Sequence, residues 1–278
     1  MISLAKVKEL EEKAKQVRLD IVNMAGTKKA CHLGGSASCA DIVTALYFHK
    51  MSHRPSEPDW PDRDRFLLSK GHASQALYAT LAQAGYFPRQ ELGKFKEVGA
   101  NLQGHPENDR VPGVEVCTGS LGQGLSVGLG MALGARMDKK SYCVYVLLGD
   151  GEMYEGQIWE AAIAASAYKL DNLVAVVDAN GFACTGKICD LVDMGSIKEK
   201  LAAFGWFVTE VDGHDLKALA DTLDGLAAVS GRPKAVIART IKGKGFPFAE
   251  NDGSYHHVFL TDELYQKAIQ GLNSGGGR

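Results

Sequence analysis

Apolar residues recur along the chain with two different periods. Five short runs rich in β-branched and aromatic residues are typical of buried strands; they cover residues 64–69, 142–148, 173–178, 206–211 and 233–239. Between these runs the apolar positions lie three and four residues apart, which predicts helices that pack by one face. Because strands alternate with helices throughout, we expect an α/β fold with a doubly wound parallel sheet.

The longest predicted helix begins the chain. Its apolar stripe spans residues 7–24, and Gly26 is expected to end it, since glycine is common just after a helix. A later helix that carries Ile42 is predicted to be capped by Ser36 or Ser38. We assign the first helix to core packing alone.

The second strand ends in a polar turn, Gly149-Asp150-Gly151-Glu152, and the third strand leads to Asn180. A right-handed crossover makes the two strands parallel neighbours, so the tips that carry Asp150 and Asn180 can meet. Carboxylate, amide and carbonyl oxygens suit Mg2+ or Ca2+, and glycine amides beside a helix start can hold a diphosphate. The plainer alternative is that Asp150 simply caps a helix.

Other reactive side chains also follow strands. Residues 70–72, Lys-Gly-His, open a helix after the first strand, where unpaired N–H groups favour an anion. Residues 242–244 place two lysines after the last strand. Ligands of open α/β sheets bind at the carboxyl ends of strands. His105 lies in a long unpatterned loop, residues 99–117, and such loops are often functional.

Two further stretches are rich in glycine. His32 precedes Leu33-Gly34-Gly35, on a loop that a ligand can approach. Residues 118–124 lead into a glycine-rich helix over residues 125–136, which must pack closely. The Gly122-x-Gly124 pattern in this stretch is not a dinucleotide-binding fingerprint. Val127 occupies the position where the third glycine is required, and no strand precedes the pattern.

Composition narrows the function classes. The net charge of −2 gives no reason to expect nucleic acid or an anionic membrane as a partner. The start of the chain is too charged for a secretory signal, and no apolar run is long enough to cross a bilayer. The six cysteines form no Cys-x-x-Cys pair, so we expect reduced, buried thiols in a cytoplasmic protein. We predict one domain over residues 1–272 and a flexible tail at 273–278.

The motifs, taken in order, resemble those of transketolases. The Gly149–Glu152 turn and the following strand to Asn180 are similar to the thiamine-diphosphate signature. The similarity covers residues 4–272 and extends to five further motifs: Cys31-His32-Leu33-Gly34-Gly35, Leu68-Ser69-Lys70-Gly71-His72-Ala73, Gly104-His105-Pro106-Glu107, Thr118-Gly119-Ser120-Leu121-Gly122-Gln123-Gly124, and Thr240-Ile241-Lys242-Gly243-Lys244-Gly245 with His256 downstream.

The resemblance implies roles for particular residues. It assigns Mg2+, or Ca2+ or Mn2+ in its place, to Asp150, Asn180 and the carbonyl of Phe182. The residues that it places around thiamine diphosphate are His72, Gly119, Ser120, Leu121, Gly151, Glu155, Asn180, Lys242 and His256. It lines the substrate channel with four histidines, namely His32, His72, His105 and His256. Neutral imidazoles exchange protons near pH 7; His256 and His32 are the expected proton acceptors, and His105 is expected to orient the donor's terminal hydroxyl.

The implied activity is transfer of a two-carbon ketol (glycolaldehyde) unit from a ketose or ketose phosphate to an aldose. In the family a second domain completes the cofactor site, and this chain resembles only the first. We therefore expect the N-terminal subunit of a split transketolase, active with a C-terminal, pyrimidine-binding subunit in an α2β2 heterotetramer. A role in carbohydrate metabolism, such as the pentose phosphate pathway, is the corresponding expectation.

Three alternatives stay open. One is a deoxyxylulose-phosphate synthase, against which the motif at residues 68–73 argues. Another is the thiamine-dependent subunit of a 2-oxo-acid dehydrogenase, which is expected to use a different histidine motif. The third is a non-enzymatic binding protein that retains the fold, against which the intact metal ligands and histidines argue.

Overall fold

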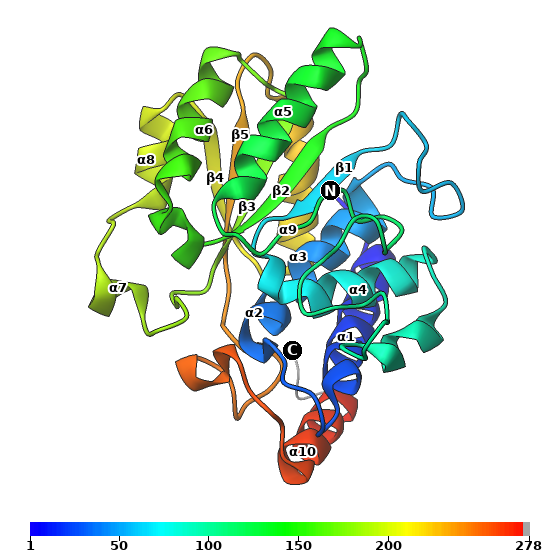
Figure 1. Ribbon diagram of the computed structural model, residues 1–278. Helices are drawn as coiled ribbons and strands as arrows, with labels where there is room; N and C mark the ends of the chain where they lie inside the picture. The colour runs from blue at the N-terminus through cyan, green and yellow to red at the C-terminus, as the bar shows by residue number, and fades with distance from the viewer. Residues whose placement is uncertain (275–278) are drawn as a thin grey trace.

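A five-stranded parallel sheet forms the centre of the computed structural model, which describes residues 1–274 (Figure 1). The strand order is β1-β2-β3-β5-β4 and every neighbouring pair is parallel. The strands are β1 (Arg65–Leu68), β2 (Val144–Gly149), β3 (Leu173–Ala179), β4 (Phe207–Asp212) and β5 (Lys234–Arg239). All five predicted strands are therefore confirmed.

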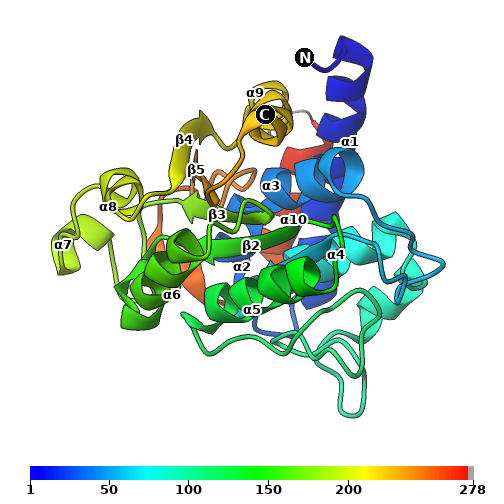
Figure 2. The same ribbon diagram turned by 90° about the horizontal axis from the view of Figure 1, so that it is seen from above.

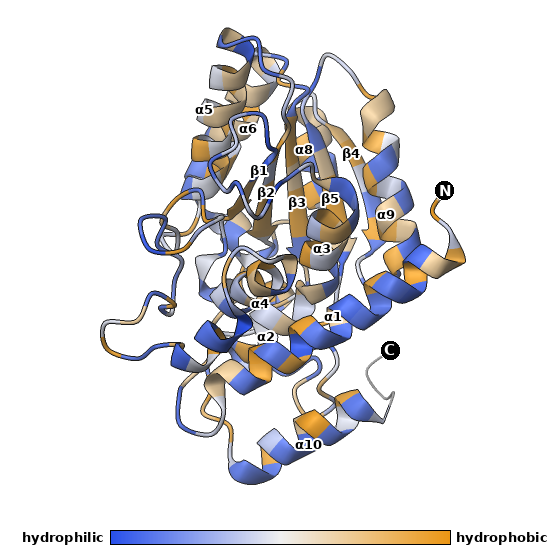
Figure 3. Cartoon of the chain, turned by 90° about the vertical axis from the view of Figure 1, so that its right-hand side faces the viewer, coloured by the Kyte–Doolittle hydropathy of each residue, from blue (hydrophilic) through white to orange (hydrophobic). Residues whose placement is uncertain are grey.

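Helices cover both faces of the sheet, so the doubly wound prediction is confirmed (Figure 2). One layer contains α5 (Gln123–Met137), α6 (Gly156–Ala167) and α8 (Ile197–Ala203). The other contains α1 (Leu4–Ala25), α3 (Ala40–Ala45), α4 (Ser74–Ala84), α9 (Leu216–Gly225) and α10 (Asp262–Asn273). Alternate residues of each strand point into the two layers; Val146 packs in the first and Leu147 in the second, both fully buried. Figure 3 shows the apolar strands enclosed by helices with mixed faces.

Short helices connect these elements. They are α2 (Leu33–Ser38), α7 (Ile188–Leu191), the π-helix η1 (Leu46–Lys50) and the 3-10 helices η2 (Gly71–Ala73), η3 (Arg89–Lys94), η4 (Gly151–Tyr154), η5 (Leu226–Ala228) and η6 (Gly253–His256). The connection between β3 and α8 thus contains one helical turn, α7. Within the described residues no helix is long and apolar enough to cross a membrane.

The predicted helix boundaries are partly right. Gly26 ends α1, with φ at +53°. Ser36 and Ser38 are not helix caps, because α2 already begins after His32 and both serines lie inside it. Of the expected tail, 273–278, Asn273 is instead the last residue of α10 and Ser274 is its C-cap; the other four residues lie outside the described part of the chain.

The cysteine prediction is half correct. All six thiols are free, and Cys31 and Cys39 are fully buried. The prediction of burial is wrong for Cys117, Cys184 and Cys189, which are exposed. These three lie on connections at the surface, where side chains need not pack in the core.

Candidate functional site

The carboxyl ends of β1, β2, β3 and β5 converge on one cavity. Its volume is about 100 Å3. Helix α2 and the segment after β5 lie together at this end of the sheet (Figure 1). The residues that line the cavity are Gly35, Lys70, His72, Leu121, Gly149, Asp150, Gly151, Glu152, Asn180, Phe182, Ala183, Cys184, Lys242 and His256. The three predicted metal ligands therefore lie side by side, together with most of the predicted cofactor residues.

Asp150 joins the tips of β2 and β3, as predicted. Its carboxylate accepts the N–H of Gly151 at 2.8 Å, which caps η4, and the N–H of Gly181 at 2.5 Å. The residue is only 4 % exposed. Burial, and then the charge of Asp178, raise the pKa of Asp150 to about 6, although the hydrogen bonds from the two N–H groups act in the opposite direction and lower it. The carboxylate is thus buried, and no lysine or arginine within residues 1–274 forms an ion pair with it.

Asn180 is oriented by a second carboxylate, Asp178, which sequence reasoning did not single out. Asp178 is fully buried and accepts from Ser38 at 2.5 Å, from Asn180 Nδ2 at 3.2 Å, and from Lys70 and Thr240. The amide nitrogen of Asn180 is engaged by Asp178, and its amide oxygen accepts the N–H of Phe182 at 3.1 Å.

Lys70, which its position after β1 predicts to lie near an anion, is already paired with a carboxylate of the protein. Its Nζ forms a buried ion pair with Asp178 and donates to the carbonyl of Gly35 at 2.9 Å. Burial raises the pKa of Asp178, but the charge and hydrogen bond of Lys70 outweigh this and lower it. The charge of Lys70 is therefore already compensated inside the protein.

Lys242 is the opposite case. It is 1 % exposed, and in the described part of the chain its ammonium group contacts the carbonyl of Ala183 and Nδ1 of His256, both at 3.1 Å, and lies 5.6 Å from the centre of the Phe182 ring. Burial, followed by repulsion from Lys70, lowers the pKa of Lys242 to about 8. Among the described residues, no carboxylate is bonded to this buried cation.

Histidines cluster beside this cavity. The ring centre of His32 lies 5.4 Å from that of His72 and 5.5 Å from that of His256. It lies 6.0 Å from that of His105. The structure therefore brings all four predicted histidines together. It adds His257, exposed at the rim, whose ring centre is 4.7 Å from that of His32.

The four predicted histidines have pKa values below the usual value and are neutral at pH 7. Burial, then the nearby charges of His257, His256, Lys96 and His105, lower the pKa of His32 to about 3. Burial and Lys242 lower the pKa of His256 to about 4. Burial also lowers the pKa values of His72 and His105. A neutral imidazole has the free lone pair that a proton acceptor needs, but a pKa of about 3 or 4 makes it a weak base at pH 7.

The paired glycines of the His32 motif have a steric reason. A Cβ on Gly34 would come within 2.9 Å of the Lys242 side chain, and one on Gly35 within 3.1 Å of His72 Nε2. The N–H of Gly243 also donates to the carbonyl of Gly34 at 3.0 Å. Helix α2 can approach the site this closely only because both side chains are absent.

A buried glutamate fixes the loop before α5. Glu152 accepts from Ser69 at 2.5 Å, from the N–H of Gly122 at 2.8 Å and from the N–H of Gly149 at 3.1 Å. It thereby joins the segments that follow β1 and β2 to the loop that carries Leu121, which lines the cavity.

Three predicted cofactor residues lie outside the cavity lining. Gly119 packs against His105, and a Cβ on Gly122 would contact Glu155 at 2.6 Å. Ser120 is exposed on the same loop, and Glu155 is exposed beside its end.

Sequence reasoning missed the contributions of Asp178, Glu152 and His257. The signal for Glu152 was its place in the Gly-Asp-Gly-Glu turn, and that for His257 was the pair of adjacent histidines. Asp178 gave no comparable signal, because its partners come from distant segments.

Comparison with known proteins identifies the class. The family model "Transketolase, thiamine diphosphate binding domain" matches residues 9–273. The chain belongs to the transketolase family, and the resemblance predicted from its motifs is confirmed.

Both separate subunits and longer enzymes resemble this chain. It is 42 % identical over 264 residues to an apulose-4-phosphate transketolase subunit of Phocaeicola vulgatus, with 95 % of this chain and 94 % of the relative covered. It is 38 % identical to a 6-deoxy-6-sulfo-D-fructose transketolase subunit of Clostridium sp., and the match covers 96 % of this chain and 98 % of that subunit. The crystal structure of Campylobacter jejuni transketolase superposes with a TM-score of 0.90 at 31 % identity, covering 96 % of this chain and 43 % of that one. The chain thus spans less than half of that longer transketolase and nearly all of the two subunits.

Proposed function

We propose that this chain is the thiamine-diphosphate-binding subunit of a two-subunit transketolase. The observation that carries the proposal is that two buried charged groups in one cavity, Asp150 and Lys242, form no ion pair in the part of the chain that the structure describes. Within the described residues, no cationic side chain is bonded to Asp150 and no carboxylate is bonded to Lys242. A divalent metal beside Asp150 and a diphosphate beside Lys242 supply both missing counter-charges at once.

The residues present fit this cofactor and metal. Asp150, Asn180 and the carbonyl of Phe182 offer hard oxygen ligands at adjacent loop tips, a set suited to Mg2+, Ca2+ or Mn2+. Lys242 and His72 line the cavity for the diphosphate, together with Gly151. When bound, thiamine diphosphate supplies the electron sink for carbon–carbon bond cleavage.

The histidine cluster supports the proton transfers of ketol transfer. A ketose donor must lose the proton of a hydroxyl group as its carbon–carbon bond breaks. His256 and His32 are neutral, adjacent and partly accessible, so each offers a free lone pair to that proton. His105, more exposed than the other two, is placed to orient the donor's terminal hydroxyl.

The substrates we propose are a ketose or ketose phosphate as donor and an aldose as acceptor. Two similar subunits bear names that refer to apulose-4-phosphate and to 6-deoxy-6-sulfo-D-fructose. Branched or sulfonated sugars therefore belong in a substrate screen beside the pentose phosphates. Participation in the pentose phosphate pathway and a cytoplasmic location stay predictions.

The partner we propose is a pyrimidine-binding subunit, in an α2β2 assembly. Helix α5 supports this. A Cβ on Gly124 would clash with Ser69, just after β1, and one on Gly128 with Val146 of β2. Apart from the neighbouring residues and backbone of α5 itself, no described atom lies within 4 Å of the Cβ positions of Gly130 and Gly134. Glycine inside an exposed helix costs about 1 kcal/mol relative to alanine. A surface that the partner approaches closely explains why the glycines are there.

The test is reconstitution. The chain is purified alone and with its partner subunit, and ketose donors are screened against aldose acceptors with thiamine diphosphate and Mg2+. We expect the pair to form a larger complex that transfers two-carbon units, and the chain alone to be inactive. An isolated, homogeneous chain with ordinary turnover contradicts the half-enzyme proposal. A complex that binds no thiamine diphosphate contradicts the cofactor assignment.

A further inference from the structure

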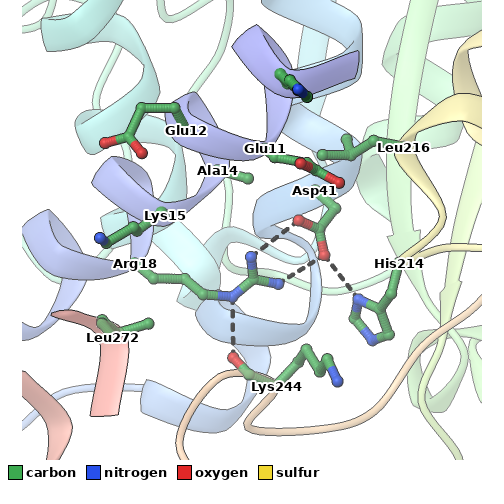
Figure 4. Close-up of a pocket in the computed structure, with 11 residues that line it drawn as sticks. Glu11, Glu12, Ala14, Lys15, Arg18, Asp41, His214, Leu216, Lys244 and Leu272 are labelled. Atoms are coloured by element: carbon green, nitrogen blue, oxygen red, sulfur yellow. Dashed lines mark hydrogen bonds and ion pairs between the residues drawn. The ribbon is translucent and has the colours of Figure 1, made fainter. Parts of the chain in front are cut away.

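A second cluster of buried charges lies against residues 240–245, the Lys242 segment. It faces a separate cavity of about 440 Å3 between α1, α3, α9 and the segment after β5 (Figure 4). At its centre are Arg18 on α1, Asp41 on α3 and His214 after β4. Arg18 and Asp41 are 3 % and 5 % exposed. None of the three lines the cavity that holds Asp150.

The cluster is organised around the Asp41 carboxylate. Arg18 donates to both of its oxygens, at 2.8 Å and 2.6 Å, in the bidentate geometry that makes such pairs strong. The Nδ1 atom of His214 lies 2.7 Å from the same carboxylate. Burial opposes the charge of Asp41, but Arg18 and the hydrogen bond from His214 lower its pKa to about 2.

Two residues of the cluster, His214 and Arg18, form hydrogen bonds with the backbone of the Lys242 segment. The N–H of Ile241 donates to Nε2 of His214 at 2.8 Å. Arg18 Nε donates to the carbonyl of Lys244 at 3.0 Å. Between these two anchors on the chain, Lys242 directs its ammonium group into the other cavity, toward His256.

This arrangement fixes the tautomer of His214. Because Nε2 accepts the Ile241 N–H, it carries no proton, so Nδ1 is protonated and donates to Asp41. One imidazole thus connects a buried carboxylate to a single backbone donor next to Lys242, much as a metal-bound histidine is oriented by a carboxylate behind it.

We infer that Arg18, Asp41 and His214 are positioning residues for Lys242: they hold its backbone from outside the site and so set how tightly the site binds a diphosphate. This inference rests on the proposed function. It predicts that the cluster acts on cofactor affinity without touching the cofactor.

The test uses His214, because removal of Arg18 or Asp41 leaves a buried charge unpaired. In the assembled complex, His214→Ala should weaken thiamine diphosphate binding, measured by calorimetry, by about 10-fold or more, as is usual for such supporting groups. His214→Gln keeps an acceptor for Ile241 and a donor for Asp41, so it should restore most of the affinity.

His49 offers a matched control. It pairs with Asp224 at 3.0 Å, and its side chain is 15 % exposed against 13 % for His214, but this pair lies on η1 and α9, away from the Lys242 segment. His49→Ala should leave cofactor affinity unchanged. Equal affinity in His214→Ala, His49→Ala and the unmodified complex overturns the inference, and so does an equal loss in His214→Ala and His214→Gln.

Amide hydrogen exchange separates this inference from the proposed function. The peptide over residues 240–245 should exchange faster in His214→Ala than in the unmodified complex, with or without cofactor, and His214→Gln should restore its protection. Unchanged exchange overturns the positioning role. If the unmodified complex binds no thiamine diphosphate, the proposed function fails, and the positioning of the segment is still decided by the exchange.

Discussion

Lys70 and Lys242 are two buried lysines whose removal should have opposite consequences. Each is 1 % exposed, and each follows a strand of the same sheet. Lys70 forms an ion pair with Asp178, whereas the ammonium group of Lys242 donates to a carbonyl and lies beside an imidazole nitrogen. Substitution by methionine preserves the length of both side chains and removes only the charge and its hydrogen bonds.

The expected stability changes can be worked from these contacts. The pKa of Lys242 falls from near 10.5 to about 8, so its charged form is destabilised by up to roughly 3 kcal/mol. Loss of its two hydrogen bonds offsets about 2 kcal/mol of this. Lys242→Met should therefore stabilise the cofactor-free protein by roughly 1 kcal/mol. Lys70→Met leaves Asp178 buried and unpaired, which costs about 3–5 kcal/mol.

The assay is thermal unfolding of the assembled complex, stripped of cofactor. At roughly 2–4 °C per kcal/mol, Lys70→Met should lower the transition by about 10 °C, and Lys242→Met should match or slightly exceed the unmodified complex. In calorimetry, Lys242→Met should bind thiamine diphosphate about 10- to 100-fold more weakly, because it lacks one charge-assisted hydrogen bond to the diphosphate. If Lys242→Met lowers the transition as much as Lys70→Met, Lys242 is a structural lysine and the reasoning is refuted.

Four further predictions concern the metal, the histidines and the assembly. Asp150→Ala should abolish Mg2+-dependent thiamine diphosphate binding and keep the fold; unchanged affinity by calorimetry in the complex contradicts this. His256→Ala should lower turnover by about 100-fold or more. Near-normal turnover in this variant would mean that His256 has only a structural role. Because the pKa of His32 falls from 6.5 to about 3 on burial, the unfolded chain protonates first; stability should drop as pH falls below about 6.5, and His32→Asn should flatten that drop in thermal unfolding. Gly134→Leu should weaken partner binding in sedimentation, whereas Gly271→Leu, an equally open helical glycine on α10, should not.

The parts of the site that follow from local sequence were predictable. A strand, a glycine turn and a helix place Asp150 at a sheet edge, and the crossover rule places Asn180 beside it. Both positions depend on residues within one βαβ unit. The structure confirms that the two tips meet, since the N–H of Gly181 donates to Asp150.

The state of each buried charge was not predictable from local sequence. Lys70 and Lys242 both precede a glycine after a strand, so the local pattern does not separate them; only the resemblance to transketolases assigned Lys242, and not Lys70, to the cofactor. What separates them is Asp178, which reaches Lys70 from β3, more than a hundred residues along the chain. Asp41 likewise meets His214 across 173 residues. Such pairings are set by the packing of the layers and leave no periodic signal in the sequence.

Asp150 and Asp178 show how a single step along a strand decides between metal binding and structure. Gly149 is the register partner of Asp178, so Asp150 lies one residue beyond that pair, at the tip, where its oxygens face loop amides and the cavity. Asp178 lies inside β3 and is fully enclosed by Lys70, Ser38 and Thr240. The enclosed carboxylate has its counter-charge, so a cation gains little by approaching it. The carboxylate at the tip forms no ion pair with a described side chain, which makes it the position where a divalent ion contributes most.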